Sequence, residues 1–316
     1  MKKHQKIYLE NHFSEVDKII KQNKNKRNLI KSPKLIDILH CDSNNIYKPW
    51  LIDAHKNYLY IVDYSNFKIH KICLKNLKQE LIFGKGKGRG SGGLLNVNDI
   101  AFGKDKLFLA DGKKRTIEIY STNGKFIKSI KIKAHPHRIL INTNTKRIIS
   151  QNTDDRVRYF HLYDYNGNLL KKFGGPLVNK ELNSPHYHEF SFLQLSDSTF
   201  LQLTRVLGVM GFYRNKKLRF IKETIDGIQD PNILEGRPTL FPASTAELYH
   251  DNFILLATKY KDGITEHYCD IYDKESLSYL YSFEISEPCG DITVHNNKLI
   301  LRNYKNNNLY IYLLQQ

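Results

Sequence analysis

The stretch that decides the fold is FGKGKGRGSGGL (residues 83–94), followed by NDIAFGKDKLFLADGKKRTIEIYSTNGKFIKSIKI (residues 98–132). A glycine-rich loop precedes four short segments in which apolar and polar residues alternate, the pattern of half-buried β-strands. Asn123-Gly124 joins the last two segments and predicts a type I′ hairpin turn, which needs positive φ at both central residues. The unit is therefore predicted to be a four-stranded antiparallel sheet.

The glycines of the loop also fit the spacing of a dinucleotide-binding motif. Gly88, Gly90 and Gly93 satisfy G-x-G-x-x-G. That motif works only when a helix follows, because the helix N-terminus faces the pyrophosphate. Strand-like segments follow here, so we interpret the loop as a connection between two sheets.

Imperfect copies of this unit fill the rest of the chain. Residues 28–316 allow about 48 residues for each of six copies, the spacing of propeller blades. The second strand of each copy is the clearest; these segments are YLYIVD (58–63), KLFLAD (106–111), KRIISQN (146–152), STFLQLT (198–204), NFILLAT (252–258) and NKLILRN (297–303).

The last copy ends after its third strand, and an isolated strand near the start supplies the missing piece. PKLIDIL (33–39) is predicted to pair beside 308–314 and so to close the ring. The predicted fold is an all-β, six-bladed β-propeller of four-stranded antiparallel blades. Residues 28–316 would form the propeller and residues 1–27 a basic N-terminal arm. Within the arm, Val16–Ile20 is predicted as a short helix and Lys21–Arg27 as a solvated run.

The central repeat is similar to a known group of repeats. KGRGSGGLLNVNDIAFGKDKLFLAD followed by TIEIYSTNGKFIKSI resembles an NHL-type repeat, and most of all the TolB-like six-bladed propellers. In that family the loop commonly reads Gly-Arg-Gly-Pro-Gly-Glu-Phe, and Gly88, Arg89, Gly90 and Gly92 match it. The resemblance implies a propeller and, for many relatives, a place in the cell envelope. It implies no uniform activity.

Composition leaves several classes of partner open. The chain has 316 residues and a formal net charge of +17, which is compatible with nucleic acid or polyanionic glycans. Lysines are spread along the whole chain, so a solvated basic surface is the favoured interpretation. Four cysteines (Cys41, Cys73, Cys269, Cys289) form no C-x-x-C pair. We expect free thiols, with a disulfide as the alternative outside the cytoplasm.

Localisation is predicted only conditionally. No segment has the apolar length of a transmembrane helix, and the N-terminus lacks the apolar core of a signal peptide. The expectation is a cytoplasmic protein, or an envelope or periplasmic one if a leader precedes the sequence.

The candidate site is the mouth of the predicted channel, bordered by the first strand of each blade. Polar and aromatic residues there come from different blades; they are Trp50, Asp99, His137, Arg138, His188, Glu189, Glu247 and Asp291. Carboxylates and imidazoles could hold a divalent cation or act as acid and base. No nucleophile motif is present, so no catalytic residue and no cofactor is assigned.

Three functions remain. The favoured one is a non-catalytic propeller that binds a protein, peptide or glycan on one face. The alternatives are a channel-mouth, metal-dependent hydrolase or lyase, and nucleic-acid binding through a basic face.

Overall fold

The computed structural model describes residues 19–24, 26–152, 159–175, 177, 190–204, 208–227, 240–261 and 264–314. The described residues form six β-sheets and one short 3-10 helix, η1 (Asp42–Asn44). The chain divides into two compact units. Unit 1 holds residues 1–34 and 176–290, and unit 2 holds residues 35–175 and 291–316.

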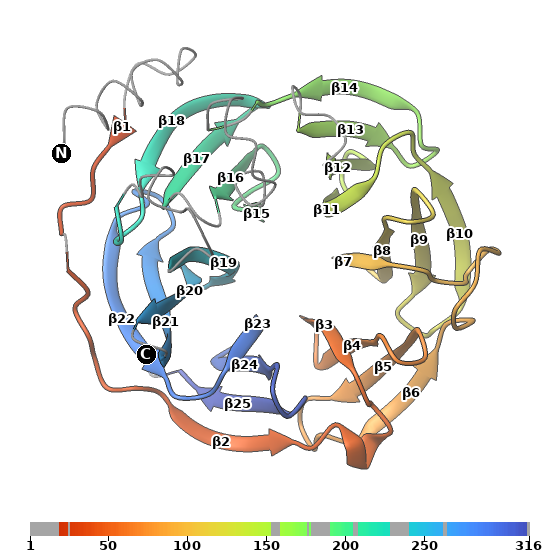
Figure 1. Ribbon diagram of the computed structural model, residues 1–316. Helices are drawn as coiled ribbons and strands as arrows, with labels where there is room; N and C mark the ends of the chain where they lie inside the picture. Colours follow the sequence, from red (N-terminus) through yellow and green to blue (C-terminus); the bar gives the residue numbers. More distant parts are fainter. Residues whose placement is uncertain are drawn as a thin grey trace. The chain divides into compact units, whose positions relative to one another are not determined.

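Three sheets of unit 2 are antiparallel meanders, each with its strands in chain order (Figure 1). The first contains β3 (Pro49–His55), β4 (Tyr58–Asp63), β5 (Lys68–Cys73) and β6 (Gln79–Phe83). The second contains β7 (Val97–Gly103), β8 (Lys106–Asp111), β9 (Thr116–Ser121) and β10 (Phe126–Lys131). The third contains β11 (Pro136–Asn142), β12 (Arg147–Asn152), β13 (Phe160–Asp164) and β14 (Leu169–Phe173).

The fourth sheet of unit 2 joins the two ends of the sequence. Its strand order is β2-β25-β24-β23. The strands are β2 (Lys34–Leu39), β25 (Leu309–Leu313), β24 (Lys298–Asn303) and β23 (Cys289–His295). The predicted pairing of 33–39 beside 308–314 is therefore confirmed. It leaves no unpaired edge on β25, which would otherwise be open to another chain.

Unit 1 contains the other two sheets. One holds β15 (Phe190–Gln194), β16 (Thr199–Thr204), β17 (Val209–Arg214) and β18 (Lys217–Glu223), and the other holds β19 (Leu240–Tyr249), β20 (Asn252–Lys261), β21 (Ile264–Asp273) and β22 (Tyr279–Ile285). A short strand, β1 (Ile19–Ile20), adds to β18 in parallel. The helix predicted for Val16–Ile20 is thus wrong at Ile19 and Ile20. The solvated run predicted for Lys21–Arg27 is wrong at Gln22 and Arg27, which bond to unit 1.

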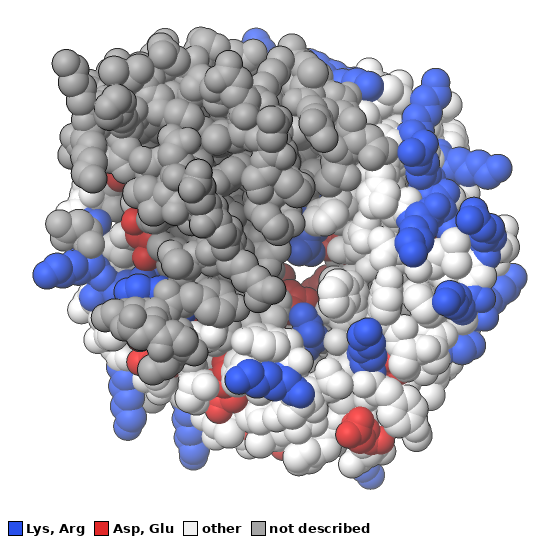
Figure 2. Space-filling model, in the orientation of Figure 1, with Lys and Arg blue, Asp and Glu red and all other residues white. Residues whose placement is uncertain are grey.

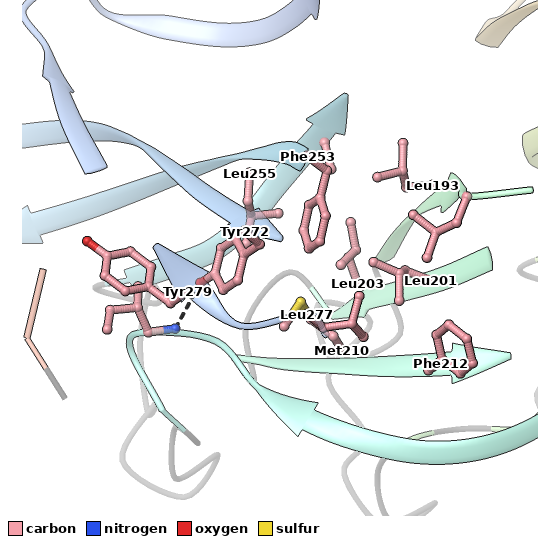
Figure 3. Packing of buried hydrophobic residues seen from close by; sticks show 13 residues of the cluster. Leu193, Leu201, Leu203, Met210, Phe212, Phe253, Leu255, Tyr272, Leu277 and Tyr279 are labelled. Atoms are coloured by element: carbon pink, nitrogen blue, oxygen red, sulfur yellow. Dashed lines mark hydrogen bonds between the residues drawn. The ribbon is translucent and has the colours of Figure 1, made fainter. Parts of the chain in front are cut away.

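Apolar residues fill the space between neighbouring sheets within each unit. In unit 1 one cluster joins β15–β17 to β20 and β21, with Leu201, Met210, Phe253 and Tyr272 all fully buried (Figure 3). In unit 2 similar clusters join each of the sheets β3–β6 and β11–β14 to β7–β10. The second strands of these sheets are buried along most of their length: every residue of β4 after Tyr58 and of β8 after Lys106 is buried.

The glycine-rich loop before β7 is held by a buried ion pair. Lys114 Nζ donates to Glu118 Oε1 at 2.7 Å and to the carbonyl oxygens of Gly90 and Gly93 at 3.0 and 2.6 Å. Gly92 N donates to Glu118 Oε2 at 3.2 Å, and its carbonyl accepts from the Tyr120 hydroxyl. The loop leads into a strand, which agrees with its interpretation as a connection.

The hairpin at Asn123-Gly124 has a different turn from the predicted one. Only Gly124 of the pair has positive φ, at 80°, so the type I′ prediction is wrong. Ser121 N donates to the carbonyl of Lys125 at 2.8 Å, and the register shifts between Phe126 and Lys128. The register shift makes Ile127 the extra residue of a β-bulge. Bulges are common in hairpins whose loops are longer than two residues.

All four cysteines are free thiols, as expected. Cys41, Cys269 and Cys289 are buried and Cys73 is partly buried.

Candidate functional site

Three carboxylates and one arginine on the first strands of unit 2 are buried or partly buried. Asp53 lies on β3, Asp99 on β7 and Asp291 on β23, while Arg138 lies on β11. These strands are the innermost of their sheets in Figure 1. Three of the four residues were predicted, and Asp53 was not.

Asp99 and Asp291 each bond to the neighbouring sheet of unit 2. Asp99 Oδ2 accepts from Ile139 N at 2.7 Å, and its Oδ1 accepts from Arg138 Nη1 at 3.0 Å. Asp291 Oδ2 accepts from Ile52 N at 3.4 Å. A first strand has a neighbouring strand on one side only, so some of its backbone amides lack a partner within the sheet. The two carboxylates accept hydrogen bonds from such amides.

Thr293 makes a third link of the same kind. Its hydroxyl accepts from Ala54 N at 3.1 Å and donates to Asp53 Oδ1 at 3.3 Å. Asp53 therefore sits where β3 and β23 meet, with its carboxyl already engaged by a neighbouring blade.

Burial controls the ionisation of this group of carboxyls. Loss of hydration, followed by repulsion from Asp99, raises the pKa of Asp53 to about 8. Loss of hydration also raises the pKa of Asp99 and of Asp291, although Arg138 opposes the rise at both and Arg302 opposes it at Asp291. Asp53 is therefore mostly protonated at neutral pH and adds no charge of its own.

Asp53 was missed because Trp50 was taken as the channel-mouth position of β3. Strand pairing makes Leu51 the counterpart of Asp99, since each follows the register shift of its own strand. Strand alternation then puts Asp53 on the same face, two residues deeper. The sequence signal for Asp53 was an acidic residue inside the strand segment LIDAH (51–55).

Trp50 and His137, two further predicted site residues, lie on β3 and β11 of unit 2. Trp50 is 44 % exposed, and its ring lies 5.6 Å from that of Tyr64 and under the guanidinium of Arg302 at 5.8 Å. His137 lies on β11 and is partly buried. Glu247 lies on β19 in unit 1, and His188 and Glu189 lie outside the described residues. Within the described ranges, no three His, Cys, Asp or Glu side chains are grouped to hold a metal ion. The divalent cation stays a prediction.

A cleft on unit 2 is a second candidate. We call it the basic cleft: its volume is about 910 Å³, and it is lined by the β7–β8, β11–β12 and β13–β14 turns together with Ser121 and Ile127. Its cationic lining residues are Lys104, Lys106, Lys146 and Arg147, and its acidic ones are Asp105 and Asp164. Figure 2 shows Lys and Arg side chains gathered over this part of unit 2, at the right of the view.

Both acids of the basic cleft are already engaged. Asp105 Oδ1 accepts from Lys56 Nζ at 2.6 Å, and this bond is the main cause that lowers the pKa of Asp105. Asp164 accepts from the side-chain amide of Asn168 at 2.9 Å and from two backbone amides of its own turn. The three lysines are exposed, so the potential in the cleft is positive.

No known protein family and no curated protein matches the chain in sequence. Solved structures do match. A protein of Bacteroides fragilis NCTC 9343, described as putatively exported, has a TM-score of 0.65 at 12% identity, covering 94% of this chain and 99% of that one. A DUF4221-family protein from Bacteroides vulgatus scores 0.56 at 11% identity, covering 93% and 99%. The WD40 propeller domain of Doa1 scores 0.52 at 13% identity, covering 84% and 78%.

These likenesses concern the fold. Together with six sheets of four blade strands each, they identify the chain as an all-β, six-bladed β-propeller, as predicted. No helix among the described residues is long and apolar enough to span a bilayer.

Proposed function

We propose that this propeller is a non-catalytic binding module, and that its basic cleft holds an acidic segment of a protein partner. The basic cleft is the observation that carries the proposal. Its volume of about 910 Å³ is within the range of formed ligand sites, about 300–1,000 Å³. Cations from two separate turns face one space whose acids are already bonded, which favours an anionic occupant.

The lining also favours a peptide over a uniformly charged polymer. Ile127 and Tyr165 both line the cleft: Ile127 is 42 % exposed, and the ring of Tyr165 lies 5.6 Å from that of Phe108. Apolar surface between cations suits a segment in which acidic and apolar residues alternate. The WD40 domains among the similar structures support, by analogy of fold alone, a module that binds other proteins.

The inner carboxylates support the non-catalytic part of the proposal. Asp99 and Asp291 accept hydrogen bonds from backbone amides of neighbouring sheets, which is a structural use of both side chains. The glycine-rich loop supports assignment of the chain to the NHL-type, TolB-like propellers. An envelope location is supported by the likeness to a protein described as putatively exported.

The test is binding of a fluorescent peptide of alternating Glu and Leu to two charge-matched variants. Lys106→Glu/Lys146→Glu changes the basic cleft, and Lys75→Glu/Lys78→Glu makes the same charge change on the turn between β5 and β6. We expect the first to weaken binding at least about tenfold at low salt and the second to change it less than about twofold.

Three results would contradict the proposal. Equal weakening by both variants would mean that only net charge matters. A stronger preference for single-stranded RNA or a sulfated glycan, lost in Lys106→Glu/Lys146→Glu, would assign the cleft to a different class of partner. Turnover of hydrolase or lyase substrates with added divalent metal, abolished by Asp291→Ala, would favour the enzymatic alternative.

A further inference from the structure

The N-terminal segment of unit 1 is bound to the outer strands like an added peptide. We call residues 19–24 and 26–32 the strap; Figure 1 shows these residues along the outside of β18 and β22. It begins as β1, in parallel register with β18 through Ile19–Ile221 and Ile20–Lys222. It continues as a parallel bridge between Leu29 and Ser282 on β22.

Backbone bonds fix the strap on β22. Ser282 N donates to the carbonyl of Asn28 at 2.9 Å, and Ile30 N donates to the carbonyl of Ser282 at 2.9 Å. Asn28 N donates to the hydroxyl of Tyr279 at 2.8 Å. Such main-chain pairing along an open edge is how strand-addition sites hold extended peptides.

Gln22 gives the strap its first side-chain anchor. Its amide nitrogen donates to the carbonyls of Glu223 at 2.8 Å and Leu277 at 3.0 Å, and its amide oxygen accepts from Tyr279 N at 2.9 Å. One side chain thereby satisfies backbone groups from both sheets of unit 1.

Arg27 gives the second and stronger anchor. It bonds Asp226 through Nη1 and Nη2 at 2.7 and 2.6 Å, and Asp270 through Nε and Nη2 at 2.9 Å each. Its guanidinium carbon lies 4.6 Å from the ring centre of Tyr268. The Asp270 side chain is fully buried, and those of Arg27 and Asp226 are 13 % and 10 % exposed. Two forked carboxylates and an aromatic face make a guanidinium-specific pocket.

Little apolar burial holds the strap in place. Leu29 and Ile30 are 54 % and 46 % exposed. Its attachment therefore depends on polar contacts that another extended chain with Gln and Arg at the same spacing can reproduce. Two residues that bind the strap, Ser282 on β22 and Asp270 on β21, are also bonded to each other: Ser282 Oγ donates to Asp270 Oδ1 at 2.6 Å.

We propose that the outer edge of unit 1 is a binding site for an extended, arginine-bearing peptide strand, and that the strap is its resident intramolecular ligand. The site takes a strand in parallel register with β18 and β22 and reads its arginine through Asp226 and Asp270. A strand that competes for this edge displaces the strap.

The experiment uses the full chain and a fluorescent peptide of residues 18–33, measured by polarisation. The chain variant Arg27→Ala weakens the resident strap and should bind the peptide at least about tenfold more tightly than the wild-type chain does. A peptide carrying Arg27→Ala should bind that variant at least about tenfold more weakly, and one carrying Arg27→Lys should fall between, because lysine cannot form the fork.

A second measurement covers the case in which Arg27→Ala fails to fold. Hydrogen exchange of the Ile30 amide of the wild-type chain, which donates to the carbonyl of Ser282, reports release of the strap. Excess peptide should accelerate it at least about threefold, and the Arg27→Ala peptide should not. The proposal is overturned if both peptides bind the folded variant equally, or if neither changes the exchange rate of the Ile30 amide. The basic-cleft variant Lys106→Glu/Lys146→Glu should bind the strap peptide as wild type does, which keeps this test independent of the proposed function.

Discussion

The carboxylate of Asp99 on β7 accepts from Arg138 on β11 at 3.0 Å, and from the backbone amide that follows Arg138 at 2.7 Å. One acidic side chain therefore joins the inner strands of two blades through a charge pair and a backbone bond. Two residues that were predicted as ligand-binding groups are bound to each other.

Replacing Asp99 should cost stability. Asp99→Ala removes the acceptor of the buried Ile139 amide and the ion pair with Arg138, so we expect a loss of about 3 kcal/mol in the free energy of unfolding. Asp99→Asn keeps an acceptor oxygen and should lose about half as much. Urea unfolding at neutral pH measures both. Asp105→Ala, at an exposed pair with Lys56, is the control and should change little. Unchanged stability in Asp99→Ala would refute the structural role.

The ionisation of Asp53 should make stability fall with rising pH. Its pKa is about 8 in the folded protein and near 4 in the unfolded chain. The folded state therefore binds more protons between these values, so the stabilisation is complete below about pH 4 and is lost as pH rises through about 8.

The variant Asp53→Asn tests this. Between about pH 5 and about pH 8.5, the free energy of unfolding of the wild type should decrease by on the order of 2–4 kcal/mol more than that of the variant. Thr293 can still donate to the amide oxygen, so the packing is preserved. Parallel pH profiles for the two proteins would show that Asp53 does not titrate in this range.

The buried pair Lys114–Glu118 should behave as one unit. Glu118 is fully buried and also accepts from Thr116 and Ser129 hydroxyls at 2.7 and 2.5 Å. Either Lys114→Ala or Glu118→Ala leaves a buried charge without its partner. Each should therefore lower the free energy of unfolding by about 3–5 kcal/mol. The double variant should lose at least about 1 kcal/mol less than the sum of the two. Additive losses in chemical unfolding would mean that the pair is not coupled.

Gly112 should resist substitution for a steric reason. A Cβ atom there would lie 2.3 Å from His135 Nε2 and 2.4 Å from Asn98 Nδ2, which themselves are 3.1 Å apart. Gly112→Ala should therefore lower the free energy of unfolding, measured with urea, by about 1–3 kcal/mol. Adding His135→Ala should restore part of this loss. Gly88→Ala is the matched control, since nothing lies within 4 Å of its added Cβ; an equal loss there would exclude the steric explanation.

The sequence by itself determined the blades. Strand alternation and turn residues repeat along the chain, and these are local signals that survive without knowledge of the neighbours. YLYIVD and KLFLAD were predicted with the bounds that β4 and β8 have. The pairing of PKLIDIL with the last strand followed from counting, because a blade lacking a strand exposes an edge.

Only the tertiary structure decided what the polar residues do. Asp99 and Arg138 were correctly placed on first strands, but their bond to each other depends on how two blades meet. Asp53 was missed because its depth along β3 matters only beside β23. Arg27 lies in a run of Lys and Asn that looks solvated, and its buried partners, Asp226 and Asp270, are about 200 residues or more away in sequence. Contacts between residues that far apart leave no periodic trace in the sequence, whereas hydrophobic alternation does.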